Sequence, residues 1–544
     1  MSARTIDPIT QEIVGNALAS IADEMATTIF RTAHSTVVRD GMDFSAALCD
    51  ANGETVAQAV TVPFHLGSVP HAMATLRAKW GDRMRPGDVF VMNDPFDGGI
   101  HLQDIFVFKP VFHDGELVGF ATTTAHHADV GGRLPGSAAC DNTEIFQEGI
   151  RLPWLRLYDR GEPVETVFEV IRANVRIPRM TLGDLSAQVA ATTVAERALQ
   201  ELAERYGRPR LADLMTGLVE HTERLVRSEI AGWPDGTATF TDYLDSDGIE
   251  RRDVPITATV TIMGDEITAD LTESAPMVAG ALNSTRSFIQ ACVYQAVRSA
   301  LEVEIPNTSG AFRPIHVLTK PGTIAHVVMP GASSMRGVTG FRALDAVNGA
   351  LAQLIPDRVP AAGEGGNTLA VFGSERQDGS RFIFYELVVG TWGGTPEDDG
   401  NDGVTNPASL AANIPVEVAE SEFPIVIERY GLVPDSGGAG QYRGGLAVER
   451  VWRCLTPNTS LIVRSDRAAH PPYGLQGGGP GALSSNLLVH PDGTEEVLPS
   501  MFSTTIQAGD VYVHRTAGGG GWGDPALRDP QRIADDIADG KVTG

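Results

Sequence analysis

Residues 92–132 read MNDPFDGGIHLQDIFVFKPVFHDGELVGFATTTAHHADVGG, a segment that combines two apolar runs with four histidines. The first run, 105–112, ends at His113-Asp114-Gly115-Glu116, and the second run follows over 117–124. An Asp-Gly pair between apolar runs is typical of a β-hairpin. We therefore predict two antiparallel strands joined by a tight turn, with the other three histidines at the open end of the hairpin.

Asp104 and His126 are predicted to lie near each other at that open end. Counting outward from the turn, a plain two-residue connection places Asp104 opposite Ala125, one place from His126. A bulge or a three-residue loop would instead place Asp104 opposite His126, with β-carbons about 5 Å apart. His101 reaches the same end from the turn at Gly98-Gly99.

Two imidazoles and one carboxylate at a strand end suit a borderline divalent metal such as zinc, manganese or iron. Three protein ligands would also leave coordination positions open for water or substrate. The H-x-x-D spacing is weak by itself, and a loop histidine beside a strand-capping aspartate explains it equally well. Neighbouring strand residues point to opposite faces, so His126 and His127 are not expected to bind one ion together.

Several motifs follow one another along nearly the whole chain: DPITQEIVGNAL (7–18), GMDFSAALCDANGE (41–54), HLGSVPHA (65–72), NDPFDGGIHLQDIFVFKPVF (93–112), AHHADVGG (125–132), DSGGAGQYRGGL (435–446) and GGGGWGDP (518–525). Together they resemble the hydantoinase B/5-oxoprolinase family. That family includes the B-type subunits of ATP-dependent hydantoinases and caprolactamase and the alpha subunits of acetone-type carboxylases. The resemblance implies a metal site whose ligands fall on Asp43, His101, Asp104 and His126.

Two further polar residues are candidates for the same cleft. Asp43 stands directly before the predicted hairpin FSAALCD–ANGE–TVAQAV, although taken alone it is better interpreted as a turn residue. The segment 63–71, PFHLGSVPH, is predicted as a loop that leads into a helix beginning at His71. His65 in that loop is a candidate to face the metal.

Composition limits the kinds of partner that we expect. The chain has 42 basic and 69 acidic residues and a net charge of −27. Nucleic acid and anionic membranes attract clustered positive charge, so neither is expected as a main partner. The N-terminus lacks the apolar core of a secretory signal, and no apolar run of about 18 residues is present. Four widely spaced cysteines without a C-x-x-C pair fit a reduced setting, so we predict a cytoplasmic protein.

Periodicity predicts a multi-layer α+β fold with antiparallel sheets. Residues 1–160 are expected to form an N-terminal α+β region with the metal site, residues 161–235 a helical segment, and residues 236–544 a mixed region rich in strands and Gly turns. The helical segment should hold three amphipathic helices over 163–175, 181–207 and 210–233. Asp184 and Glu196 are expected on solvated faces of this segment rather than in catalysis.

The opening helix should begin near Pro8, with Asp7 or Thr10 as its cap. Apolar residues recur in it at every fourth position, which predicts one buried stripe: Ile13, Ala17, Ile21, Met25 and Ile29.

The glycine-rich motifs are not expected to bind a nucleotide. GGGGWGDP (518–525) lacks the Gly-Lys-Ser/Thr ending of a phosphate-binding loop, and GGAGQYRGGL (437–446) lacks a strand–Gly–helix frame. Tight backbone packing between strands accounts better for these glycines. No G-x-S-x-G elbow is present, so covalent catalysis by a serine is not supported either.

The family resemblance, together with the candidate metal site, implies a hydrolase subunit that opens the C–N bond of a small cyclic amide (hydantoin, 5-oxoproline or lactam). The resemblance implies a hetero-oligomer in which an ATP-binding A-type subunit phosphorylates the amide oxygen, while this chain uses its metal to activate water. His127, or else His65, would move a proton to the departing nitrogen. The alternatives are the alpha subunit of an ATP-dependent ketone carboxylase and a non-catalytic assembly partner.

Overall fold

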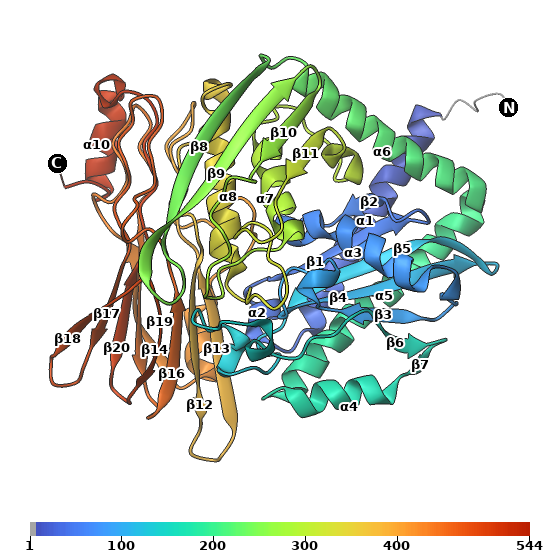
Figure 1. The fold of residues 1–544 in the computed structure, drawn as a ribbon, viewed down its shortest axis with the longest axis horizontal. Helices are drawn as coiled ribbons and strands as arrows, with labels where there is room; N and C mark the ends of the chain where they lie inside the picture. Colours follow the sequence, from blue (N-terminus) through green and yellow to red (C-terminus); the bar gives the residue numbers. More distant parts are fainter. Residues whose placement is uncertain (1–6, 544) are drawn as a thin grey trace.

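The computed structural model describes residues 7–543, which form an α+β molecule with four β-sheets. The strands of the two C-terminal sheets lie on the left of Figure 1, and the N-terminal sheet, in blue, lies on the right. Paired strands in these sheets run antiparallel, apart from the parallel pair β10 and β11. The predicted fold class is confirmed, while the division into three regions stays a prediction.

The N-terminal sheet carries the predicted hairpin at its centre, in the strand order β2-β1-β5-β4-β3-β6-β7. Its strands are β1 (Phe44–Asp50), β2 (Thr55–Gln58), β3 (Val89–Met92), β4 (Asp104–His113), β5 (Glu116–His126), β6 (Leu155–Asp159) and β7 (Glu162–Pro163). Both faces of the central strands are buried. Helices therefore have to cover the sheet on both sides.

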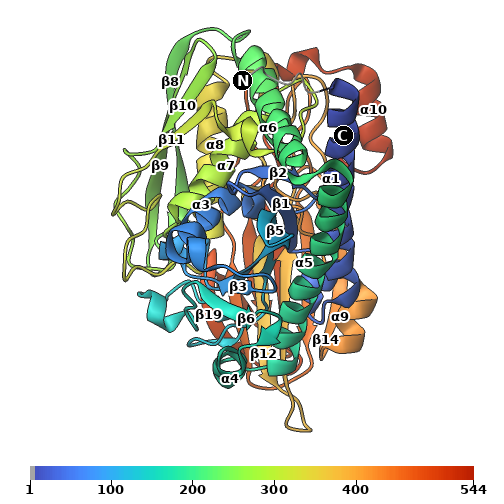
Figure 2. The ribbon, with the colours of Figure 1, turned by 90° about the vertical axis from the view of Figure 1, so that its right-hand side faces the viewer.

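Long helices pack on one side of this sheet and a second helical group lies on the other (Figure 2). The first group consists of α1 (Pro8–Thr32), α2 (Thr36–Arg39), α4 (Glu165–Asn174), α5 (Pro178–Tyr206) and α6 (Arg208–Ile230). The second group consists of α3 (Pro63–Trp80), α7 (Arg286–Ser299) and α8 (Arg336–Leu351). Helix α8 is buried along its whole length, and it also packs on β8 and β9 of the next sheet.

The remaining sheets follow in the chain after α6. One has the order β11-β10-β9-β8 and consists of β8 (Gly236–Ser246), β9 (Arg251–Met263), β10 (Glu266–Asp270) and β11 (Ile315–Leu318). The two C-terminal sheets have the orders β13-β12-β16-β19 and β14-β15-β20-β17-β18. Their elements are β12 (Thr368–Glu375), β13 (Arg381–Val388), α9 (Val416–Glu422), β14 (Ile425–Leu432), β15 (Val448–Cys454), β16 (Thr459–Arg464), β17 (Ser485–Val489), β18 (Glu495–Leu498), β19 (Met501–Ile506) and β20 (Val511–Arg515), followed by α10 (Pro530–Ala538). They share an aromatic core in which Phe372 of one sheet contacts Trp452 of the other.

The three helices predicted between residues 163 and 233 are present as α4, α5 and α6. The loop predicted over 63–71 is wrong, because α3 already begins at Pro63 and contains Pro70 within it. Packing overrides the local signal there: the Cα of Gly67 lies so close to Ala291 of α7 that a β-carbon would clash. Within residues 7–543, none of the helices combines the length and apolar character that crossing a bilayer requires.

Two smaller predictions differ from the structure. Helix α1 is capped by Asp7 as predicted, and Ile21, Met25 and Ile29 of the predicted stripe are buried, but Ile13 is 51% exposed and the first turns bury Val14 and Leu18 instead. A strict four-residue repeat exceeds the helical period of 3.6 residues, so a stripe extrapolated over four turns drifts off the buried face. Asp184 is buried rather than solvated, because it accepts hydrogen bonds from the backbone N–H groups of His34 and Ser35.

The C-terminal glycines let extended segments pack backbone against backbone. Gly519 donates to the carbonyl of Gly445, and Gly521 donates to that of Gly479. A β-carbon on Gly444 would collide with the carbonyl of Gly519. These segments lie outside the named strands. The structure therefore shows the tight backbone packing, but between loop segments and not between strands as predicted.

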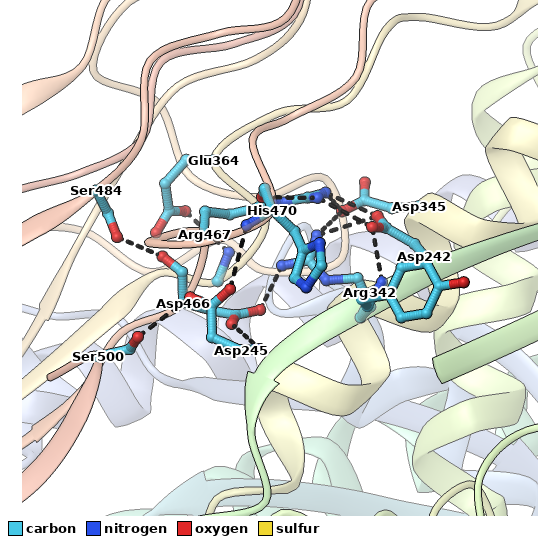
Figure 3. A network of polar contacts seen from close by, with 12 residues as sticks. Asp242, Asp245, Arg342, Asp345, Glu364, Asp466, Arg467, His470, Ser484 and Ser500 are labelled. Carbon is cyan, nitrogen blue, oxygen red and sulfur yellow. Dashed lines mark hydrogen bonds and ion pairs between the residues drawn. The ribbon is translucent and has the colours of Figure 1, made fainter. Parts of the chain in front are cut away.

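A buried ion-pair network ties α8 to β8 and to the C-terminal sheets (Figure 3). Arg342 lies 3.0 Å from Asp345 of its own helix, 3.3 Å from Asp242 of β8 and 2.5 Å from Asp466. Arg467 lies 3.0 Å from Asp242 and 2.9 Å from Asp345. Both arginine side chains are fully buried. Three segments far apart in the sequence are thus fixed relative to one another by shared carboxylates.

We expect Arg342→Leu to lower the free energy of unfolding by roughly 3–5 kcal/mol, because it leaves buried carboxylates without a partner. Equilibrium urea unfolding measures this loss. Arg453→Leu is the matched control, since Arg453 pairs with Glu428 on the surface and its removal should cost no more than about 1 kcal/mol. Equal losses in the two variants would contradict a structural role for the network.

Candidate metal centre

The hairpin of β4 and β5 places Asp104 directly opposite His126. The turn pairs His113 with Glu116 across two residues, and the register shifts by one residue between Val111 and Phe112. The bulge that the sequence analysis required for this pairing is therefore present. Without it, Asp104 would face Ala125 and its side chain would point to the same sheet face as that residue.

His101, Asp104 and His126 form a tight buried cluster at the end of the hairpin. Nε2 of His101 and Nδ1 of His126 each lie 3.1 Å from Oδ1 of Asp104, and the two nitrogens are 3.2 Å apart. All three side chains are at most 4% exposed. One donor atom from each residue thus points toward a common centre.

Asp43 and His65 extend this cluster from two other elements. Asp43 stands just before β1, and its carbonyl accepts a hydrogen bond from the backbone N–H of His126. Its carboxylate lies 3.8 Å from Nδ1 of His126 and 3.7 Å from Nε2 of His65. His65, on the first turn of α3, also places Nε2 3.4 Å from Oδ1 of Asp104.

Hydrogen bonds fix which nitrogen of two histidines faces the cluster. Nδ1 of His101 lies 3.0 Å from the carbonyl of Ser334, which can only accept, so this nitrogen carries the proton. Nδ1 of His65 lies 3.2 Å from Oγ of Ser45, and that hydroxyl donates its own proton to the carbonyl of Val62. With the proton on Nδ1, each ring directs its Nε2 to the cluster, as in metal-binding histidines.

The charge of the cluster is only partly balanced by the protein. Burial lowers the pKa of His101 to about 3, with Arg336 nearby adding to the effect, so this ring is neutral at pH 7. Burial alone would raise the pKa of Asp104, but the positive charge of Arg336 outweighs it and holds the pKa well below its usual range. Arg336 lies 2.8 Å from Oδ2 of Asp104, while Asp43 has no arginine or lysine partner among the ion pairs of residues 7–543.

These residues fit a divalent ion. Among the described residues, Oδ1 of Asp43 and Nε2 of His65 are buried polar atoms with no hydrogen-bond partner. Donors bound to one tetrahedral ion at about 2.1 Å would lie roughly 3.4 Å apart, close to the separations observed between the donor atoms of His101, Asp104 and His126. Nitrogen and carboxylate ligands suit zinc, manganese or iron.

His127 is not part of the cluster. Its Nε2 lies 3.0 Å from Oε1 of Gln188 on α5, and Gln188 in turn donates to the carbonyl of Ile105. The alternation of side chains along a strand thus sends His126 and His127 to opposite faces, as expected. Burial lowers the pKa of His127, so it too is neutral at pH 7.

Sequence reasoning missed the residues that support the cluster from the second half of the chain. Arg336 begins α8, 232 residues after Asp104, and its guanidinium lies over the rings of Phe64 and Phe288. The ring of Tyr385 on β13 packs 4.8 Å from that of His126. Glu148 accepts from the backbone of Ser333 and Ser334, the turn that holds His101. No local pattern marks such distant contacts.

Comparison with known proteins agrees with this architecture. Residues 7–525 match the hydantoinase B/oxoprolinase family model. A putative D-/L-hydantoinase subunit from Pseudomonas sp. (strain NS671) is 31% identical over 99% of this chain and 94% of its own length. The beta subunit of caprolactamase from Pseudomonas jessenii is 32% identical over 99% of this chain and 94% of its own length.

Two solved structures share the fold. The crystal structure of ATP-dependent caprolactamase from Pseudomonas jessenii superposes with a TM-score of 0.92 at 31% identity, covering 99% of this chain and 95% of that chain. A nucleotide-free acetone carboxylase superposes equally well, with a TM-score of 0.92 over 99% of this chain and 78% of that chain. Its identity is 20%, so this likeness concerns the fold alone.

We expect the purified chain to contain a stoichiometric amount of a divalent metal ion, and the variant His101→Ala/Asp104→Ala to have lost it. Mass spectrometry of the digested protein measures the metal. His316→Ala/Glu266→Ala is the control, because it removes an exposed histidine–carboxylate pair at 3.1 Å elsewhere in the chain. Equal metal content in the cluster variant and the wild type would contradict the proposed ligands.

Proposed function

Because the chain belongs to the hydantoinase B/oxoprolinase family, we propose that it is the metal-dependent subunit of an ATP-dependent enzyme that opens a small cyclic amide. The names of the hydantoinase and caprolactamase relatives support a cyclic amide as substrate. The observation that carries the proposal is the buried cluster of His101, Asp104 and His126 with Asp43 beside it.

In this proposal Asp43, His101, Asp104 and His126 hold the ion. When bound, a divalent ion supplies Lewis acidity and makes water a better nucleophile at neutral pH. Ser334 keeps Nε2 of His101 unprotonated toward the cluster, and Arg336 occupies Oδ2 of Asp104 so that Oδ1 remains directed inward. The buried surroundings exclude bulk water, which strengthens each of these electrostatic contacts.

We assign proton transfer to His65 in preference to His127. Ser45 holds the proton on Nδ1 of His65, while Nε2 faces the cluster with no hydrogen-bond partner in the described structure. That nitrogen can accept a proton from water and deliver it to the departing ring nitrogen. His127 is hydrogen-bonded to Gln188 on the opposite face and would have to move before it could act.

The amide requires activation before water can attack it, because resonance makes its carbonyl a poor electrophile. We propose that an A-type partner subunit transfers a phosphoryl group from ATP to the amide oxygen. Water then adds to the carbonyl carbon and the C–N bond breaks, so that the nitrogen takes up a proton and an acyl phosphate remains. A second water hydrolyses this acyl phosphate to the carboxylate and releases phosphate. Both relatives are named as subunits, which supports a hetero-oligomer. We propose a cytoplasmic location, where ATP is available.

Assay of this chain with and without a co-expressed A-type subunit tests the proposal. We expect ATP-dependent ring opening of hydantoin, 5-oxoproline or a lactam only when both subunits are present. ADP release and the ring-opened product are both measured, the latter as a primary amine from 5-oxoproline or a lactam and as a carbamoyl amino acid from hydantoin. Ring opening by the A-type subunit alone would contradict a catalytic role for this chain, whereas bicarbonate-dependent consumption of a ketone would identify a carboxylase instead.

We expect His65→Gln to lower kcat roughly 10²–10⁴-fold, with little change in KM or in metal content, because glutamine can keep the contact with Ser45 but cannot transfer a proton. The pH profile of kcat should lose the limb that reports this group. His127→Gln is the matched control, with kcat expected near that of the wild type. The reverse order of the two effects would assign proton transfer to His127.

A further inference from the structure

A cavity of about 570 Å³ lies beside the C-terminal half of α8, whereas the metal cluster lies at the N-terminal end of this helix. Arg336 at the start of α8 contacts the cluster, and Asp345 and Asn348 further along the helix line the cavity. Nine residues of α-helix separate Arg336 from Asp345 and span about 14 Å. The cavity is therefore distinct from the metal centre, although Pro63 on its wall stands only two residues before His65.

Three buried polar side chains on the cavity wall have atoms without a hydrogen-bond partner in residues 7–543. Oδ2 of Asp345 accepts from Arg342 and Arg467, which leaves Oδ1 free. Oε2 of Glu364 accepts from two backbone N–H groups, which leaves Oε1 free. The carboxamide of Asn348 makes no side-chain hydrogen bond. Asp345, Asn348 and Glu364 are 3%, 7% and 5% exposed, so these groups depend on whatever enters the cavity.

The rest of the wall combines apolar surface with negative charge. Apolar contacts are offered by Leu301, Leu344, Pro360, Trp392 and Leu410. The indole N–H of Trp392 is already donated to the carbonyl of Thr405, so its ring presents carbon to the cavity. Among the charged residues of the wall, carboxylates outnumber arginine: Glu302, Asp345, Asp357, Glu364 and Glu397 against Arg358. Arg358 is itself paired with Glu229 and Glu302.

The buried carboxylates and the apolar wall together favour a ligand that has a positive charge and an apolar chain. Burial raises the pKa of Asp345 to about 6 and also raises that of Glu364, because each charge is removed from water with incomplete compensation. An ammonium group can donate three hydrogen bonds, and its charge would offset this cost. A carboxylate or phosphate would meet repulsion from the same oxygens.

We propose that this cavity binds a primary alkylammonium compound, with its charge between Asp345, Asn348 and Glu364 and its chain against the apolar wall. The site stands on its own geometry. The amine formed by opening a cyclic amide is one such compound, and that identification alone rests on the proposed function.

Calorimetric titration of the full-length chain with hexylamine, 1-hexanol and hexanoate at pH 8 tests the site. We expect hexylamine to bind at least tenfold more tightly than hexanol, and hexanoate not to bind. Glu364→Gln keeps an oxygen for the two backbone N–H groups but removes the charge, so hexylamine affinity should fall at least fivefold. Equal affinity for hexylamine and hexanol would overturn the proposal.

Asn348→Asp is an independent variant that should change the affinity in the opposite direction from Glu364→Gln. It adds a carboxylate beside the ammonium group, so hexylamine should bind more tightly. Asp378→Asn, in an exposed turn, is the control and should change nothing. Unchanged affinity in both cavity variants would overturn the assignment of these residues.

Competition between 6-aminohexanoate and hexylamine supports the reaction product as ligand. Lack of competition would overturn only that identification, and the ring-opening assay fails or succeeds independently of either result.

Discussion

Two buried carboxylates and three imidazoles converge at one strand end, and the balance of their charge is the constraint on which the structure depends. Asp104 has an arginine partner in Arg336, but Asp43 lies beside the rings of His65 and His126 and has no arginine or lysine partner among the ion pairs of residues 7–543. Burying an unpaired carboxylate is costly, so such a cluster is stable only if a proton or a cation compensates it. A divalent ion would do so and would also use the lone pair that Ser334 directs inward through His101.

The rest of the fold can be understood as the support of this cluster. The β4–β5 hairpin supplies Asp104 and His126, and the segment just before β4 supplies His101. Helix α3 supplies His65, and α8 supplies Arg336. Helix α8 is in turn fixed by the ion pairs of Arg342 with β8 and the C-terminal sheets. The same helix forms one wall of the cavity that we propose binds an alkylammonium compound. One buried helix thus connects the metal centre with the proposed ligand site.

Local signals predicted the parts of this arrangement that are local. The Asp-Gly turn and the two apolar runs predicted the hairpin, and counting residues showed that a bulge was needed to bring Asp104 opposite His126. Spacing pointed weakly to His101, Asp104 and His126, and the family resemblance strengthened this set and added Asp43. Arg336 and Tyr385 could not be found, because they reach the cluster from more than 200 residues away. The predictions of a loop over 63–71 and of a solvated Asp184 failed for the same reason, because contacts with distant segments decide both features.

X-ray absorption spectroscopy at the metal edge of the purified protein tests the central claim most directly. The account predicts nitrogen and oxygen atoms bonded at about 2.0–2.2 Å, with the scattering pattern of imidazole rings and no sulfur. A weaker imidazole signal, or loss of the metal, in His101→Ala would connect that spectrum to this cluster. A metal bonded to sulfur, or a hydrated ion without imidazole ligands, would contradict the account.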